Sequence, residues 1–224
     1  GIALPAGYHR LHVDGLSGST LLIAAPPRCH RPSALDGDGR VWGPTLQLYA
    51  LRSDHNWGIG DFGDLARVVE QWATRGAGIV GLNPLHALFP HNPEHASPYS
   101  PSSRLFLNYL YIDVERVEDL RDSEEARRLI GSAEFQARVR ALRAAELVDY
   151  SGVAEVKLQV LNLLYASFQR QLALDTDRAR AFRAFQQREG QALRLHATCE
   201  ALQESMHRAD TSIDLPAVLT LREH

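Results

Sequence analysis

Cysteine is scarce in this chain, with Cys29 and Cys199 the two thiols among 224 residues. Two cysteines cannot build the disulfide framework of a small secreted domain, so this composition favours a reducing compartment. No stretch approaches the ~20 apolar residues that a membrane-spanning helix needs, and no secretory signal peptide is recognisable. The sequence therefore predicts a cytoplasmic protein without a membrane partner.

An excess of charge of either sign is also missing. The chain carries 24 Lys and Arg against 27 Asp and Glu, a formal net charge of −3 with neutral histidines. Because this balance offers no basic surface, we expect no nucleic-acid partner. The chain begins with Gly1 rather than methionine, so we expect that it was processed or cut from a longer protein. Nothing in the sequence indicates an oligomeric state.

The stretch 42–114 is predicted to contain a strand–helix–strand unit. Residues 46–51 and 79–82 are apolar runs of strand length, and a third strand is expected at 109–114. A helix is expected between the first two runs, because apolar residues there have helical spacing: Leu65, Val68, Val69 and Trp72. Such a unit places its two strands in parallel.

The loops that follow the strands of parallel α/β folds carry the functional site. Here those loops are 52–60 and 86–103, and the second is far longer than the ~2–6 residues usual for such a connection. In the second loop, Pro98 and Pro101 restrict the backbone around Tyr99. A fixed tyrosine suits a pyranose, whose C–H face stacks on the ring while its hydroxyls form hydrogen bonds. A tyrosine packed under the loop is the alternative.

The remaining segments differ in character from this unit. Runs 8–13 and 20–25 with turn residues between them predict a β-hairpin. After Asp119 the pattern is helix after helix, with breaks near Gly131 and Gly190. The expected helix starts are Ser123, Ser151, Asp175 and about Gln191. The expected domains are 1–40 (the end of a β-rich module plus a linker), 41–118 (the first βα units), 119–208 (a helical insertion) and 209–224 (a tail).

Two common sites fit the residues poorly. Gly58 to Gly63 spells the dinucleotide fingerprint, but six loop residues separate it from Leu51, where the glycine turn should follow the strand directly. Asp61 would also put a carboxylate where the pyrophosphate belongs, so we expect it to cap its own helix. A metal could bind the loop group His86, His91, Glu94 and His95. No cysteine joins that group and its spacing matches no zinc pattern, so no metal is expected.

A reaction centre is equally hard to find. Hydrolysis or transfer of sugars needs two carboxylates, and the expected loops offer Asp54 and Glu94, which nothing marks as partners. No nucleophile elbow around a serine is present. The chain therefore has a predicted substrate-facing surface and no catalytic residue of its own.

Four motifs resemble the 4-α-glucanotransferases (amylomaltases, or disproportionating enzymes) and occur in family order. They are residues 46–53, 56–65, 81–88 and 96–103. The resemblance is weaker from 7 to 9 and through the helices to about Leu202. It implies the start of a (β/α)₈ barrel of the TIM type, incomplete here with about three strands, with a helical insertion and preceded by a short β-hairpin.

The resemblance also implies a chemistry. An aspartate attacks an α-1,4-glucan, and a glutamate protonates the leaving oxygen and later activates an incoming sugar, so that a glucan segment is transferred with retention. No organic cofactor is expected, and maltooligosaccharides are the expected partners. Those carboxylates lie downstream in the family, so we expect this chain alone to be inactive. A non-catalytic glucan-binding module, or a related hydrolase, is the rival interpretation.

The candidate residues follow from these arguments. The expected sugar-binding residues are Tyr99, Ser97, His86 and Trp57. The residues expected to support the site are Asp61, Asn83 and Asn108.

Overall fold

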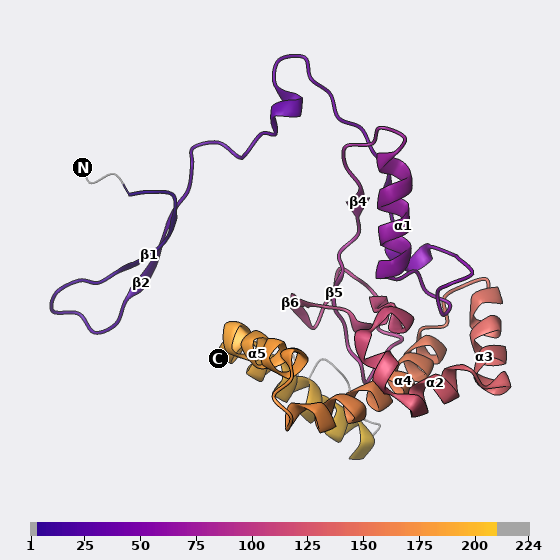
Figure 1. Cartoon of the computed structure of the whole chain (residues 1–224). Helices are drawn as coiled ribbons and strands as arrows, with labels where there is room; N and C mark the ends of the chain where they lie inside the picture. The colour runs from indigo at the N-terminus through magenta and orange to yellow at the C-terminus, as the bar shows by residue number, and fades with distance from the viewer. Residues whose placement is uncertain (1–3, 210–224) are drawn as a thin grey trace. The chain divides into compact units, whose positions relative to one another are not determined.

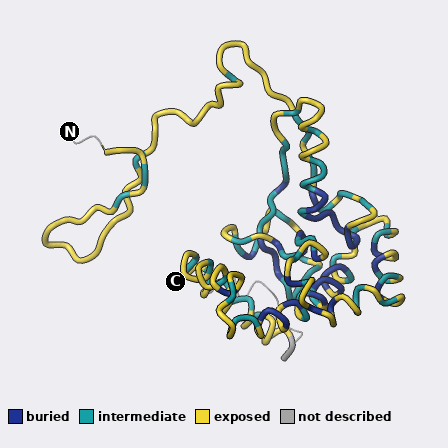
Figure 2. Tube along the Cα trace, in the orientation of Figure 1, coloured by how far each residue is buried: buried dark blue, intermediate teal, exposed yellow. Residues whose placement is uncertain are grey.

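The computed structural model describes residues 4–209, and the chain divides into two compact units, Gly1–Trp42 and Gly43–His224. The first unit contains the predicted hairpin, β1 (Gly7–Leu11) antiparallel to β2 (Thr20–Ala24). A short 3₁₀ turn, η1 (Ser33–Leu35), follows. No residue from 4 to 42 is buried, and Figure 2 shows the hairpin in the colours of exposed and intermediate positions. The described part of this unit therefore has no core of its own.

The second unit opens with the predicted strand–helix–strand unit (Figure 1). Strand β3 (Thr45–Leu46) lies parallel to β4 (Gly81–Leu82), and helix α1 (Phe62–Ala73) connects them. Asp61 caps α1 as predicted, by accepting a hydrogen bond from the Asp64 backbone N–H at 3.0 Å. The parallel pairing is confirmed, but both strands are much shorter than expected.

The first strand ends early because a side chain replaces its neighbour strand. The Leu48 N–H donates to Oδ1 of Asn83 at 3.0 Å, and the chain then turns into η2 (Leu48–Ala50). The prediction of a strand through Leu51 is therefore wrong beyond Leu46. Because the side-chain oxygen of Asn83 accepts the Leu48 N–H, this N–H does not pair with the backbone of β4, and the β3–β4 ladder ends.

The third expected strand, 109–114, is wrong for a similar reason. This segment forms two 3₁₀ turns, η3 (Tyr109–Tyr111) and η4 (Val114–Arg116). Oδ1 of Asn108 accepts the Leu110 N–H at 3.0 Å, which starts the first turn. The ammonium of Lys157 donates to the carbonyl oxygens of Leu110 and Ile112, at 2.7 and 2.6 Å. These carbonyls are therefore taken by a lysine instead of a strand.

A small antiparallel pair occupies the expected long loop. Strand β5 (His86–Ala87) pairs with β6 (Ser103–Leu107), with His86 opposite Leu107 and Ala87 opposite Ser103. The sequence analysis did not predict this pair. It brings the two ends of the loop together and leaves residues 88–102 as the connection between the strands.

Helices make up the rest of the described chain. They are η5 (Glu118–Asp122), α2 (Glu124–Ile130), α3 (Ala133–Ala144), α4 (Tyr150–Leu172) and α5 (Asp177–Ala209). The predicted breaks near Gly131 and Gly190 are confirmed, and α5 has non-helical backbone at Gly190. No helix among residues 4–209 is long and apolar enough to cross a membrane.

The caps of these helices agree only in part with the sequence. Ser123 caps α2 as predicted, by accepting a hydrogen bond from the backbone of Ala126. Asp149, and not Ser151, caps α4 through the Gly152 N–H at 2.7 Å. Helix α5 begins at Asp177 and not at the predicted Asp175. Beyond Ala209 the predicted tail lies outside the described residues.

One core joins the α/β segment to the helices. Leu48 and Ile59 from the first part are fully buried in the same cluster as Val139, Val153 and Val156 from the helices. Figure 2 shows these buried positions concentrated in the second unit. The core runs across residue 118, where the sequence suggested that one domain ends.

Gly58 and Gly76 both adopt a backbone conformation that favours glycine, but only Gly58 also lacks room for a side chain. Both have positive φ, +93° and +82°, but a Cβ on Gly58 would lie 2.7 Å from Leu142 Cβ, whereas Gly76 faces open space. We expect Gly58→Ala to lower the free energy of unfolding by about 2–4 kcal/mol, from backbone strain plus crowding. Gly76→Ala, the matched control, should lose about 1 kcal/mol from strain alone. Urea denaturation of both variants measures the difference, and equal losses would contradict close packing of α3 on this loop.

Candidate functional site

The loop 52–60 does not form the exposed surface that the sequence predicted. Residues 56–60 are buried, with Leu142 of α3 against Gly58 and with Leu48 and Leu51 against Gly60. Arg52 donates to the carbonyl oxygen of Gly58 at 2.7 Å, and Arg143 of α3 donates to the carbonyl oxygen of Asn56. The prediction that this loop faces the substrate is therefore wrong from Asn56 onward.

Trp57 lies in the core instead of at a binding surface. Its side chain is 3% exposed, and its ring meets Phe135 edge to face with centroids 5.1 Å apart. The indole N–H donates to Oε1 of Glu115 at 2.9 Å, which satisfies its one polar group. Trp57 thus joins the loop to the helices, and this placement removes it from the residues that can contact a sugar in this structure.

A buried network at the start of α1 holds this loop in shape. Asn56 is fully buried and its Nδ2 donates to Oδ2 of Asp64 at 2.7 Å and to the carbonyl oxygen of Leu51 at 3.2 Å. Arg67 donates to the other Asp64 oxygen at 2.6 Å. Asp61 and Asp64 cap each other's backbone N–H groups, forming a capping box.

The two carboxylates of this network have opposite pKa shifts. Burial raises the pKa of Asp61, against the backbone hydrogen bond from Asp64 and the positive charge of Lys157. Burial acts in the same direction on Asp64, but hydrogen bonds, led by the one from Asn56, bring its pKa below the usual value. Both groups are occupied by structural hydrogen bonds, so neither is available as an exposed catalytic carboxylate.

Asn83 and Asn108 lie before β5 and after β6, at the same end of this antiparallel pair. Asn83 receives the Leu48 N–H, and the Asn108 N–H donates to the carbonyl oxygen of Leu85 at 3.0 Å. Both amides are buried. Next to them, burial raises the pKa of Tyr111 to about 12, although a hydrogen bond with Asn83 acts in the opposite direction. These residues fix the backbone that carries the 88–102 connection.

The connection presents Tyr99 to solvent on a fixed base. Tyr99 is 71% exposed, and the Ser100 N–H donates to the carbonyl oxygen of Ser97 at 3.2 Å, which closes a turn around Pro98. Ser102 is buried, and its hydroxyl donates to the carbonyl oxygen of Leu88 at 2.7 Å. The alternative of a tyrosine packed under the loop does not agree with this exposure.

A groove of about 1190 Å³ runs along this loop and β6. Tyr99 and Ser100 line it together with residues 101–106. Ser97 lies in the turn beside Tyr99, and His86 is half-buried on β5. Of the four expected sugar-binding residues, Tyr99 is the one that lines this groove. Sequence analysis missed β6 as the floor of the groove, although the apolar run 105–107 could have predicted a strand.

The loop histidines do not form a metal site. His95 packs edge to face on Phe89 at 4.9 Å, and Oε1 of Glu94 accepts the Ser151 hydroxyl at 2.5 Å. The His91 ring lies 5.8 Å from that of His207, and burial together with this histidine lowers the pKa of His91. In the described part of the chain, no group of three or more His, Cys, Asp or Glu is placed to hold a metal ion.

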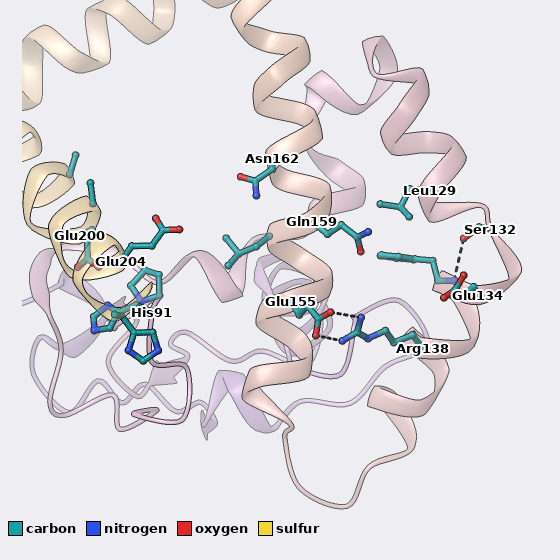
Figure 3. Close-up of a pocket in the computed structure, with 16 residues that line it drawn as sticks. His91, Leu129, Ser132, Glu134, Arg138, Glu155, Gln159, Asn162, Glu200 and Glu204 are labelled. Carbon is teal, nitrogen blue, oxygen red and sulfur yellow. Dashed lines mark hydrogen bonds and ion pairs between the residues drawn. The ribbon is translucent and has the colours of Figure 1, made fainter. Parts of the chain in front are cut away.

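A second cavity, of about 910 Å³, lies among the helices. Figure 3 shows Glu155 and Gln159 on the side of their helix that faces Arg138 and Leu129, whereas Glu200 and Glu204 lie on the other side near His91. Nη1 of Arg138 donates to Oε1 of Glu155 at 2.8 Å. The described lining of this cavity includes no tyrosine or tryptophan, and its Phe135 is buried. This acidic cavity therefore lacks the exposed aromatic face that the Tyr99 groove has.

Lys157 is a buried charged residue that sequence analysis did not single out. It is 1% exposed, and its ammonium donates to two carbonyl oxygens of the 110–112 turn. Burial lowers its pKa to about 8, although the nearby charges of Asp61, Asp113 and Asp64 act to raise it. The lysine therefore joins α4 to the α/β segment with a charge that is costly to bury.

The chain is similar to known proteins over most of its length. A family model described as 4-alpha-glucanotransferase matches residues 46–218. A 4-alpha-glucanotransferase of Haemophilus influenzae is 38% identical over 207 residues, which are 91% of this chain and 30% of that protein. One of Mycobacterium tuberculosis is 34% identical over 219 residues, 90% of this chain and 28% of that protein. The chain thus spans less than a third of these relatives.

A solved structure gives the same result for the fold. The crystal structure of amylomaltase from Corynebacterium glutamicum superposes with a TM-score of 0.76 at 34% sequence identity. The match covers 91% of this chain and 28% of that protein.

The depressed pKa of Lys157 predicts a rise in stability with pH. In the unfolded chain lysine keeps its proton to about pH 10.5, whereas in the folded chain it loses it near 8. Between these values the unfolded state binds more protons, so the free energy of unfolding should increase by up to about 3 kcal/mol. Denaturation of wild type and Lys157→Met at pH 7.5, 9 and 10 measures this, and the variant should lack the rise. Parallel curves would show that Lys157 is not the group responsible.

Proposed function

Because the chain belongs to the 4-alpha-glucanotransferase family, we propose that it supplies part of the sugar-binding face of such an enzyme. The enzyme would transfer α-1,4-glucan segments between maltooligosaccharides by retaining double displacement. The observation that carries this is Tyr99, exposed on a loop whose base is fixed by Ser102. Its ring would stack on a glucose unit while Ser97, in the same turn, would hydrogen-bond a hydroxyl.

The reaction itself needs carboxylates from outside this chain. A retaining mechanism requires two carboxyl groups about 5–5.5 Å apart beside the sugar. In the described residues, Asp61 and Asp64 are buried in the capping box, and Glu94 accepts a hydrogen bond from Ser151. The relatives are more than three times as long as the part matched here. We therefore place the nucleophile and the acid/base in that remainder, and expect the 224 residues alone to be inactive.

The proposal also covers the fold of the enzyme and its location in the cell. The parallel pair β3–β4 would be the start of a (β/α)₈ barrel, with 41–118 as its first units and 119–208 as a helical insertion. Residues 1–40 would end a β-rich module, and 209–224 would be a tail. We propose a cytoplasmic enzyme that acts on maltooligosaccharides without an organic cofactor.

A non-catalytic glucan-binding module is the second candidate. The same exposure of Tyr99 favours it, because a binding surface is useful without any carboxylate. A related hydrolase would differ in admitting water instead of a sugar to the intermediate. Product analysis separates these three.

Activity on maltotriose tests the proposal directly. The 224-residue chain and the longest product of its gene are each incubated with maltotriose. We expect glucose together with longer maltooligosaccharides from the longer product alone. Activity in the 224-residue chain would contradict the placement of the carboxylates. Glucose and maltose without longer products would indicate a hydrolase, and inactivity of both would favour the binding module.

Tyr99→Ala in the longer product tests the sugar contact. Loss of the stacking ring should reduce kcat/KM on maltotriose by about tenfold to a hundredfold, since burial of an aromatic ring contributes about 1.5–3 kcal/mol. Tyr165→Ala is the matched control, because Tyr165 is 51% exposed on α4 and does not line the groove. An unchanged Tyr99→Ala enzyme, or an equal loss in both variants, would refute the role of Tyr99.

A further inference from the structure

Helix α5 is two helices joined at Gly190. The backbone there has φ 54° and ψ −126°, a conformation that glycine adopts without a steric penalty. The first half is held on the helical block, where Phe182 meets Phe168 of α4 edge to face with centroids 5.1 Å apart. Because the helix breaks at Gly190, the second half, 191–209, takes its own direction and packs elsewhere.

The second half of α5 lies against the β5–β6 pair and its connection at two points. The first is His196, which lines the groove beside Tyr99 and stacks its ring on Phe106 of β6, with centroids 4.5 Å apart and planes at 10°. The second is His207, about three turns further along the helix, whose ring centroid lies 5.8 Å from that of His91. Figure 3 shows His91 beside this part of α5. A histidine therefore stands at each end of the contact.

The surroundings of His91 favour its neutral imidazole. The ring packs edge to face on Phe89 with centroids 6.0 Å apart, and its Nδ1 is buried without a hydrogen-bond partner among the described residues. A charged imidazole has an N–H on both nitrogens, so protonation would leave a buried donor unpaired. Burial, together with the charge of His207, lowers the pKa of His91, although Glu204 acts in the opposite direction.

Few of the nearby charges can compensate a proton on His91. The titratable and charged side chains around the contact come from the connection, α3, α4 and α5, and they are Glu94, His95, Arg138, Glu155, Glu200 and Glu204. Glu94 accepts the Ser151 hydroxyl, and Glu155 pairs with Arg138 on the other side of α4. His95 packs on Phe89. Glu204 is therefore the carboxylate that acts on His91, and one carboxylate cannot neutralise two imidazolium rings.

We propose that this contact is a pH-sensitive switch, in which protonation of His91 and His207 releases the end of α5, 200–209, from the 88–102 connection. Two positive rings would then face each other where the neutral rings pack. The contact at His196 should persist, because a proton there gains attraction from Glu200, 3.8 Å away, and from the face of Phe106. The release therefore begins at the C-terminal end of the helix. The switch acts within the chain's own fold, so it does not depend on whether Tyr99 contacts a sugar.

The direction of the pH dependence follows from His91. An unperturbed histidine has a pKa of about 6.5, and that of His91 in the packed state is lower. Between these two values the released state binds more protons than the packed state, so packing weakens as the pH falls through this window. Above about pH 6.5 the contact is complete.

Hydrogen exchange measured by mass spectrometry tests the release. From pH 7.5 to 5.5 the protection factors of residues 200–209, corrected for the pH dependence of intrinsic exchange, should fall by about tenfold in wild type. Those of α4 should stay unchanged. In His91→Gln, which keeps a neutral polar side chain, the fall should be less than about twofold. His55→Gln, the matched control, removes an exposed histidine of the loop 52–60 and should retain the full fall. No fall in wild type, or a full fall in His91→Gln, would overturn the switch.

Titration of the histidine rings by NMR provides a measurement that a general loss of packing would not reproduce. His207→Gln removes a like charge and should raise the pKa of His91, whereas Glu204→Gln removes an attractive charge and should lower it. Opposite shifts in these two variants support the proposed contact. Shifts in the same direction, or no shift in either variant, would refute it.

Discussion

The carboxylate of Asp64 is the group on which the described fold most depends. It accepts hydrogen bonds from Asn56 at 2.7 Å, from Arg67 at 2.6 Å and from the Asp61 N–H at 3.3 Å. Through Asn56 it fixes the buried loop, whose shape in turn admits α3 against Gly58. Buried polar networks of this kind are valuable only when every member is satisfied, because a missing partner leaves a desolvated charge. A single buried side chain therefore connects the first helix, the loop before it and the helical block.

This arrangement separates a buried loop that anchors the helices from an exposed loop that carries Tyr99. The loop 52–60 is used to anchor the helices, so its tryptophan and glycines are enclosed. The connection 88–102 is supported by backbone and Ser102 hydrogen bonds and by the bond from Ser151 to Glu94, and Tyr99 faces solvent. The core thus ends beneath the β5–β6 pair, and the second half of α5 completes the groove above it. Rigid support under an exposed aromatic is what a stacking contact with a sugar requires.

The sequence predicted what local patterns determine. Helix α1, its cap at Asp61 and the break at Gly190 follow from residue spacing and glycine chemistry, and all three are confirmed. The lengths of the strands were not predictable, because they are set by partners 35 and 47 residues away, Asn83 for Leu48 and Lys157 for Leu110. The flanking prolines predicted a fixed position for Tyr99 and left open whether its ring faces solvent or packs under the loop. The burial of Trp57 was not predicted, since a loop tryptophan has the same sequence signature whether a helix covers it or not.

The division between a loop that anchors the helices and a loop proposed to face the sugar is tested most directly by Trp57→Phe. Phenylalanine keeps the contact with Phe135 and loses the hydrogen bond to Glu115, so the free energy of unfolding should fall by about 1–2 kcal/mol. The dissociation constant for maltoheptaose should stay within a factor of two, as measured by isothermal titration calorimetry on the folded variant. Binding weakened tenfold with unchanged stability would contradict the account, because it would place Trp57 against the sugar instead of in the core.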